Sequence, residues 1–179
     1  MHFNLADIWE RVTDTVPDHD AVVDGACRFT FAQLDDRADR LAHVLAAEGI
    51  GPGDHVALYL QNGVEYLEGM LAAFKIRAVP VNVNYRYVEE ELRYLFNDAD
   101  AKAVIFHRAF APQLTALRPP VPPPLFARCG RPEGGVMLHA QETGNHDDYQ
   151  RESTEEHLPA GCGPAPALCR GRVSSRGIK

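Results

Sequence analysis

The sequence predicts an α/β protein, in which a small parallel sheet with flanking helices is followed by a disordered tail. Two patterns within residues 1–117 indicate this class. Apolar residues recur at helical spacing in several segments, and short apolar runs typical of buried strands alternate with them. The resulting strand–helix–strand–helix–strand order favours parallel pairing with right-handed crossovers. From residue 118 onward neither pattern continues.

The first two elements are predicted to be a helix and a hairpin. Asn4 can cap the helix and Pro17 ends it, and its apolar residues are Leu5, Ile8, Trp9, Val12 and Val16. Two short runs, residues 21–23 and 28–30, then flank Asp24-Gly25. This pair supplies the positive φ angles of a tight turn, so we expect an antiparallel hairpin.

Thr30 and Gln33 form a capping box at the start of a second helix, which extends to about Glu48. Gly49 suits its C-terminal turn. The run of residues 55–60 is apolar without alternation, which is typical of a strand buried on both faces. Asn62 is expected to cap the next helix, whose buried stripe should consist of Val64, Leu67, Met70, Leu71 and Phe74.

Two strands and one helix complete the folded part. Residues 78–83 read as a strand in which Pro80 indicates a strand end or a sheet edge. A helix near residues 89–97 should bury Leu92, Leu95 and Phe96, and residues 103–106 form the last strand. The tail, residues 118–179, is rich in Pro, Gly and Arg and holds 9 of the 13 prolines. Because its large apolar residues are sparse, we expect it to lack stable structure.

Charge and composition exclude several functions. The chain carries a net charge of −7, which argues against nucleic acid as a partner. Its most apolar stretch, residues 64–83, contains four charged residues and Pro80, so no transmembrane segment is expected. The N-terminus has neither a basic start nor an apolar run, and we expect a cytoplasmic protein. Residues 1–117 have a net charge of −8 and the tail +1, as if two unlike pieces were joined.

Five blocks of residues 1–117 carry a family resemblance. They are the leading helix with its hairpin, Phe29 to Leu34, Gly53 to Leu67, Met70 to Tyr87, and Glu91 to Asp100. In order and spacing they closely resemble the N-terminal region of acyl-CoA synthetases (fatty-acid–CoA ligases) of the AMP-binding, adenylate-forming superfamily. The resemblance implies that residues 1–117 are an incomplete N-terminal subdomain of that fold.

The resemblance also implies a reaction for the full-length family. ATP and a fatty or related carboxylic acid form an acyl-adenylate with release of pyrophosphate, and CoA then displaces AMP. Such chemistry needs a phosphate cradle, Mg²⁺ and a catalytic lysine. Nothing in this sequence matches the family's Thr/Ser/Gly-rich phosphate loop or its later motifs. None of the three lysines, Lys75, Lys102 and Lys179, lies in the family's context.

We therefore expect a truncated chain that binds no cofactor by itself, has no catalytic residues and is inactive alone. A frameshift after about Leu117, with residues 118–179 translated out of frame, would explain the tail. A second hypothesis is a non-catalytic interaction module, which pairs with a complementary fragment, a full-length synthetase or itself through its incomplete sheet. A CoA- or nucleotide-binding domain without catalysis would need a phosphate cradle that is not found.

Arg86 is the one candidate cofactor-binding residue. It follows a predicted strand, and the carboxyl ends of parallel strands face the ligand crevice. The resemblance implies a contact with the CoA nucleotide phosphate. The alternative is a turn arginine paired with one of Glu89, Glu90 and Glu91, which otherwise favour the dipole of their helix.

No metal site is expected. Possible ligands in the tail are Cys129, His139, His146, His157, Cys162 and Cys169, but they lack the close pairs of zinc sites.

Overall fold

The computed structural model describes residues 4–25, 27–117, 125–129 and 137–139. Its elements begin with α1 (Leu5–Thr15), the hairpin β1 (Asp20–Asp24) and β2 (Cys27–Thr30), and α2 (Phe31–Ala47). They continue with β3 (His55–Tyr59), α3 (Val64–Lys75), β4 (Val79–Asn82), α4 (Glu89–Asp98) and β5 (Ala101–His107). The 3₁₀ helix η1 (Arg108–Phe110), α5 (Ala111–Ala116), β6 (Leu125–Cys129) and β7 (Met137–His139) complete the order. Mixed helices and strands confirm the predicted α/β class.

Five strands form the main sheet, in the order β4-β3-β5-β6-β7. Strand β3 is parallel to both β4 and β5, and β5 is parallel to β6, whereas β7 is antiparallel to β6. Strand β4, which contains Pro80, is the edge strand of the sheet, in agreement with the position that this proline indicated. The parallel pairing of β3, β4 and β5 confirms the pattern predicted from the alternating strands and helices.

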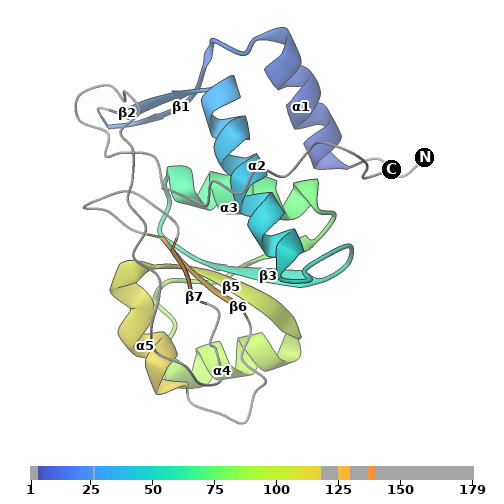
Figure 1. Ribbon diagram of the computed structural model, residues 1–179. Coiled ribbons are helices and arrows are strands. Elements are labelled where there is room, and N and C mark those ends of the chain that lie inside the picture. Colours follow the sequence, from blue (N-terminus) through green and yellow to red (C-terminus); the bar gives the residue numbers. More distant parts are fainter. Residues whose placement is uncertain (1–3, 26, 118–124, 130–136, 140–179) are drawn as a thin grey trace, which may run out of the picture.

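Helices cover both faces of this sheet (Figure 1). On one face, Val56 and Leu58 of β3 pack with Leu41 and Leu45 of α2. On the other, Ala57 and Tyr59 meet residues of α4, η1 and α5, including Leu92, Phe96, Phe110 and Leu114. The unbroken apolar run of β3 is thereby explained, because successive side chains enter opposite cores.

Local signals place most helix ends as predicted. The Asn4 side chain accepts a hydrogen bond from the Ala6 amide, and Thr30 and Gln33 exchange the two bonds of a capping box. Gly25 and Gly49 have φ angles of 61° and 85°, which suit a turn and a helix C-terminus. The expected cap at Asn62 is wrong: Gly63 occupies that position and makes no side-chain cap bond.

Two findings differ from expectation. Strands β6 and β7 lie within the tail, where no stable structure was expected; β6 gains its order by pairing with β5, a tertiary effect that local composition does not reveal. The rest of residues 118–179 lies outside the described residues. In α1, the apolar Leu5 and Ile8 are 55% and 43% exposed, and the buried residues are Ala6 and Thr13.

Among the helices that the structure describes, none is long and apolar enough to cross a membrane.

Candidate functional site

The carboxyl ends of β3, β4 and β5 lie at one edge of the sheet, because the three strands are parallel. The strands end at Tyr59, Asn82 and His107. The segments that follow them therefore lie at the edge where open parallel sheets bind ligands. This edge includes Arg86, the residue predicted from the sequence.

An aromatic cluster occupies this edge. We define the carboxyl-edge cluster as Tyr59, Tyr85, His107 and Phe110. The Phe110 ring centroid lies 4.7 Å from that of Tyr59, 5.8 Å from that of His107 and 6.3 Å from that of Tyr85, with which it is stacked. Tyr59 is fully buried and its hydroxyl donates to the Tyr87 carbonyl at 3.5 Å. Burial raises the pKa of Tyr59, so its phenol stays neutral at physiological pH.

Arg86 is exposed beside this cluster. Its Cζ atom lies 5.5 Å from the centroid of the Tyr85 ring, which is a cation–π distance. Its amide donates to Asn84 Oδ1 at 3.0 Å, which fixes the turn. Glu89 pairs instead with Arg93 at 2.7 Å, and Glu91 accepts from the Val88 amide at 2.9 Å. Within the described residues no ion pair engages Arg86, so the expected alternative pairing with Glu89–Glu91 is not formed.

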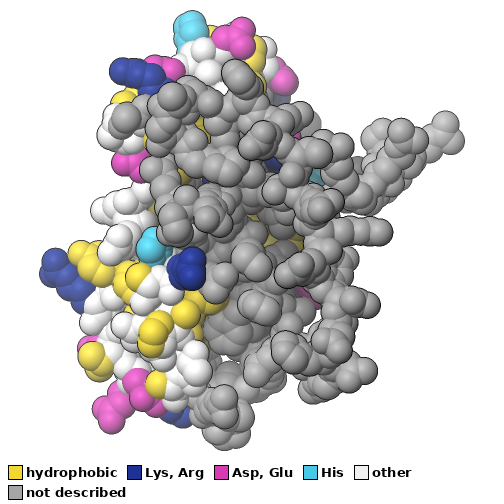
Figure 2. Space-filling model, turned by 60° about the vertical axis from the view of Figure 1, so that its left-hand side comes forward, with side chains coloured by type: hydrophobic (Ala, Val, Ile, Leu, Met, Phe, Trp, Pro, Cys, Tyr) yellow, Lys and Arg dark blue, Asp and Glu magenta, His cyan; other side chains and the backbone are white. Residues whose placement is uncertain are grey.

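Figure 2 turns forward the side of the molecule on which α5 lies. In the lower half of this view, hydrophobic side chains (yellow) lie next to basic side chains (dark blue) and histidine (cyan). Acidic side chains lie mostly toward the top and bottom of the view. An apolar surface with positive charges beside it is chemically suited to a ligand that combines an aromatic or apolar part with a negative charge.

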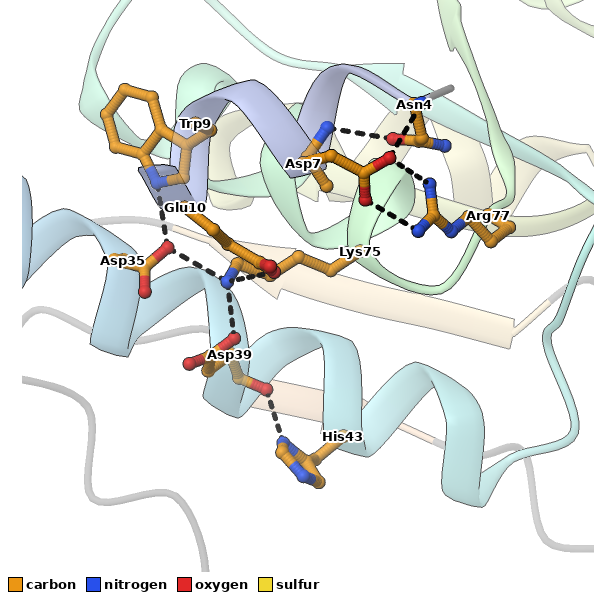
Figure 3. Close-up of polar contacts among 10 residues, drawn as sticks. Asn4, Asp7, Trp9, Glu10, Asp35, Asp39, His43, Lys75 and Arg77 are labelled. Carbon is orange, nitrogen blue, oxygen red and sulfur yellow. Dashed lines mark hydrogen bonds and ion pairs between the residues drawn. The ribbon is translucent and has the colours of Figure 1, made fainter. Parts of the chain in front are cut away.

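Lys75 is the centre of a polar cluster elsewhere in the fold (Figure 3). Its Nζ atom lies 2.7 Å from Asp39, 2.8 Å from Asp35 and 3.2 Å from Glu10. Burial by itself would lower the pKa of Lys75, but its hydrogen bonds to Asp35 and Asp39 outweigh this effect and raise the pKa. A lysine held by three carboxylates is a structural ion-pair centre and not a free catalytic amine.

Glu68 and Arg37 form a buried ion pair between α3 and α2. Glu68 Oε2 accepts from Arg37 Nε at 3.1 Å and from Nη2 at 2.7 Å, and the Glu68 side chain is 1% exposed. Its other oxygen, Oε1, has no hydrogen-bond partner among the described residues. Burial raises the pKa of Glu68, although Arg37 acts in the opposite direction.

Sequence reasoning missed both buried charges and the carboxyl-edge cluster. The signal for Glu68 and Lys75 was their helical spacing, since they lie four and eleven residues after the buried Val64 and so share its face. For the carboxyl-edge cluster, the signal was aromatic residues near strand ends: Tyr59 ends β3, and Tyr85 and Phe110 follow shortly after β4 and β5.

No metal centre is found in the part of the chain that the structure describes, since no group of three or more His, Cys, Asp or Glu residues is suitably placed there. Of the candidate ligands in the tail, Cys129 and His139 lie on β6 and β7. His146, His157, Cys162 and Cys169 lie outside the described residues.

Comparisons with known proteins identify the class. The family model described as AMP-binding enzyme matches residues 9–160. A 3-oxocholest-4-en-26-oate–CoA ligase of Rhodococcus rhodochrous is 44% identical over 122 residues, which cover 68% of this chain and 22% of the relative. A medium/long-chain-fatty-acid–CoA/3-oxocholest-4-en-26-oate–CoA ligase of Mycobacterium tuberculosis is 44% identical over 175 residues, 98% of this chain and 30% of the relative.

Solved structures agree. The N-terminal domain of FACL13 from Mycobacterium tuberculosis superposes with a TM-score of 0.64 at 34% identity, covering 69% of this chain and 32% of that one. The fold is thus that of the N-terminal domain of adenylate-forming synthetases. The chain belongs to the AMP-binding enzyme family. It spans about a fifth to a third of the length of the curated relatives named above.

The family match does not stop at Leu117. Both the family model and the alignment with the Mycobacterium tuberculosis ligase continue into residues 118–179. This continuation weighs against a shifted reading frame directly after Leu117. The frameshift stays a prediction, which reading the other two frames of the downstream DNA would test.

Proposed function

We propose that this chain is the N-terminal portion of a cytoplasmic acyl-CoA synthetase and is inactive by itself. The whole enzyme would join a fatty or related carboxylic acid to CoA, with ATP cleaved to AMP and pyrophosphate. The observation that carries this proposal is the 44% identity to a CoA ligase over 98% of this chain but only 30% of the relative. The phosphate loop and the catalytic lysine that the reaction needs have no match in this sequence.

A chimera, compared with the purified chain, tests both the proposed activity of the whole enzyme and the proposed inactivity of this chain. Residues 1–117 of this chain would replace the aligned segment of the Mycobacterium tuberculosis ligase, and ATP–pyrophosphate exchange would be measured with medium-chain and long-chain fatty acids and 3-oxocholest-4-en-26-oate. We expect exchange by the chimera and none by the purified 179-residue chain. Exchange by the chain alone, surviving removal of contaminating ligases, would contradict its proposed inactivity. A folded but inactive chimera would contradict the proposed enzyme.

We further propose that Arg86 contacts the CoA nucleotide phosphate in the whole enzyme. Its exposure at the carboxyl edge, its lack of an ion pair among the described residues and its position beside Tyr85 support this role. In the chimera, Arg86→Gln should raise KM for CoA by about tenfold, the effect of losing one charge-assisted contact. The ATP–pyrophosphate exchange that depends on the fatty acid should not change, because that half-reaction takes place before CoA reacts.

The matched control for Arg86 is Arg93→Gln, which removes the same charge from the exposed pair with Glu89 on α4. It should leave KM for CoA unchanged. An equal rise in KM in both variants would show a general effect of charge and would remove the case for Arg86.

The alternative is a non-catalytic module that associates with a complementary fragment, with a full-length synthetase or with itself. The exposed apolar side chains support it: Val79 on the edge strand β4 is 43% exposed, and Val88 and Tyr94 are 61% and 70% exposed. Light scattering of the purified chain, alone, mixed with the remaining segment of the ligase and mixed with the full-length ligase, would distinguish the proposed enzyme portion from the module. A monomer that binds neither would exclude the module.

A further inference from the structure

Several polar contacts join helix α1 to α2, to α3 and to Arg77 directly after α3 (Figure 3). The Trp9 indole donates to Asp35 Oδ1 at 2.7 Å, Glu10 lies 3.2 Å from Lys75 Nζ, and Asp7 pairs with Arg77 at 2.7 Å. Apolar contacts also contribute: Ala6 is buried, and the Trp9 ring centroid lies 5.1 Å from that of Phe31. Leu5 and Ile8 face away from the protein and are more than two fifths exposed.

The inward face of α1 also contains an unfavourable group. Thr13 is buried, and its Oγ1 atom has no hydrogen-bond partner in the described part of the chain. A buried hydroxyl without a partner loses its hydration without compensation. Apolar burial of α1 is therefore limited mainly to Ala6 and Trp9 and is opposed at Thr13, and the charged contacts add to the strength of its docking.

These charged contacts differ in their exposure to solvent. On α1, the Glu10 and Asp7 side chains are 52% and 36% exposed, and Arg77 is 44% exposed. Lys75 is only 8% exposed, and its pairs with Asp35 and Asp39 join α3 to α2 without α1. Salt screens exposed ion pairs much more than buried ones. High salt should therefore weaken the docking of α1 while α2 and α3 stay packed through Leu41, Leu45 and Ala72.

We propose that α1 is a detachable strap. It leaves α2 and α3 as a unit when its ion pairs to Lys75 and Arg77 are screened or removed, and the remaining domain stays folded. Its release uncovers the surface beneath Trp9, where the side chain packs against a buried cluster that includes Phe29, Leu34 and Val64.

Trp9 makes the test direct, because it is the only tryptophan of the chain. Acrylamide quenching of its fluorescence would be measured on the full 179-residue chain between about 0.1 and 1 M NaCl, over which the screening length falls from roughly 10 to 3 Å. Far-UV circular dichroism would be recorded in parallel. We expect the quenching constant to rise with salt while the dichroism of the sheet and the other helices is retained.

The double variant Glu10→Gln/Arg77→Gln removes both ion pairs of α1 and leaves its capping residue Asp7 in place. Each lost pair should shift the docked-to-undocked ratio by about two- to fivefold, the range for exposed pairs. Quenching in this variant should already be high at low salt. The matched control is Asp14→Asn/Arg93→Gln, which removes one acid and one base at exposed positions outside the α1 interface and should behave as the wild type.

Two results would overturn the strap. One is Trp9 quenching that does not change with salt in the wild-type chain. The other is quenching that rises only together with loss of the dichroism signal, since α1 would then unfold with the rest of the domain. The wild-type salt titration tests the strap even when the double variant does not fold.

Discussion

At the scale of single residues, the sequence identifies groups that act on their near neighbours. Asn4, Thr30 and Gln33 cap helices as predicted, because a cap needs only side chains and amides within a few residues. Glu68 could not be found in this way. Its carboxylate is buried because α2 packs on α3 and brings Arg37 to it, and such a contact joins residues 31 positions apart. Arg86 follows β4 as expected, because that strand was predicted near its observed bounds, and its role as a ligand contact stays a prediction.

The raised pKa of Glu68 predicts a particular dependence of stability on pH. A carboxyl whose pKa is higher in the folded state binds more protons there, so its contribution is fully present below the ordinary value of 4.5 and is lost as the pH rises through the folded pKa. The free energy of unfolding of the wild type relative to Glu68→Gln should thus fall as the pH rises above 4.5. The slope for one proton is at most about 1.4 kcal/mol per pH unit.

Urea denaturation of both proteins at a series of pH values measures this difference. A wild-type advantage that instead grows with pH above 4.5 would mean that Arg37 outweighs burial.

At the scale of elements, the order and approximate bounds of α1 to β5 follow from periodicity and turn residues. The segments η1, α5, β6 and β7 were not predicted. Helix α5 is a single short segment, and β6 depends on the open side of β5 for its hydrogen bonds. Helix α1 illustrates the opposite limit: its spacing predicted a helix correctly, but Leu5 and Ile8 of the predicted apolar stripe are exposed, whereas Trp9 packs on the core.

Gly69 determines how closely α3 approaches the sheet. A Cβ atom at this position would lie 3.1 Å from Leu58 Cδ2 and 3.3 Å from Ile105 Cδ1, closer than ordinary contacts. Gly69→Val should therefore lower the free energy of unfolding by about 1–3 kcal/mol through overpacking, as measured by urea denaturation. Gly51→Ala has open space around its Cβ and should change stability by less than about 0.5 kcal/mol. A neutral Gly69→Val would show that α3 can move away from β3 and β5 at little cost.

At the scale of the whole molecule, the sequence predicts a parallel α/β arrangement but not the order of the strands. The order β4-β3-β5-β6-β7 places β3 between two other strands, and this interior position agrees with its packing on both faces. The unbroken apolar run of residues 55–60 was the sign of this interior position. The pairing of β6 with β5 could not be predicted, because no periodic pattern marks residues 125–129.

Strands β3 and β5 contribute side chains to the cores on both faces of the sheet. We therefore expect the helices on the two faces to unfold together with the sheet. Leu92 of α4 is fully buried in the core on the face opposite α2 and α3. Leu92→Ala should lower the free energy of unfolding by about 2–5 kcal/mol, the range for a truncated core leucine. The most protected amides of β3, and of α3 on the other face, exchange through global unfolding. Their hydrogen exchange should therefore accelerate by the factor that corresponds to the lost free energy of unfolding. Tyr94→Ala, on the same helix but 70% exposed, should leave both quantities nearly unchanged. Acceleration confined to α4 and α5 would instead show that the helices on this face open separately, with the sheet and its opposite layer as an independent unit.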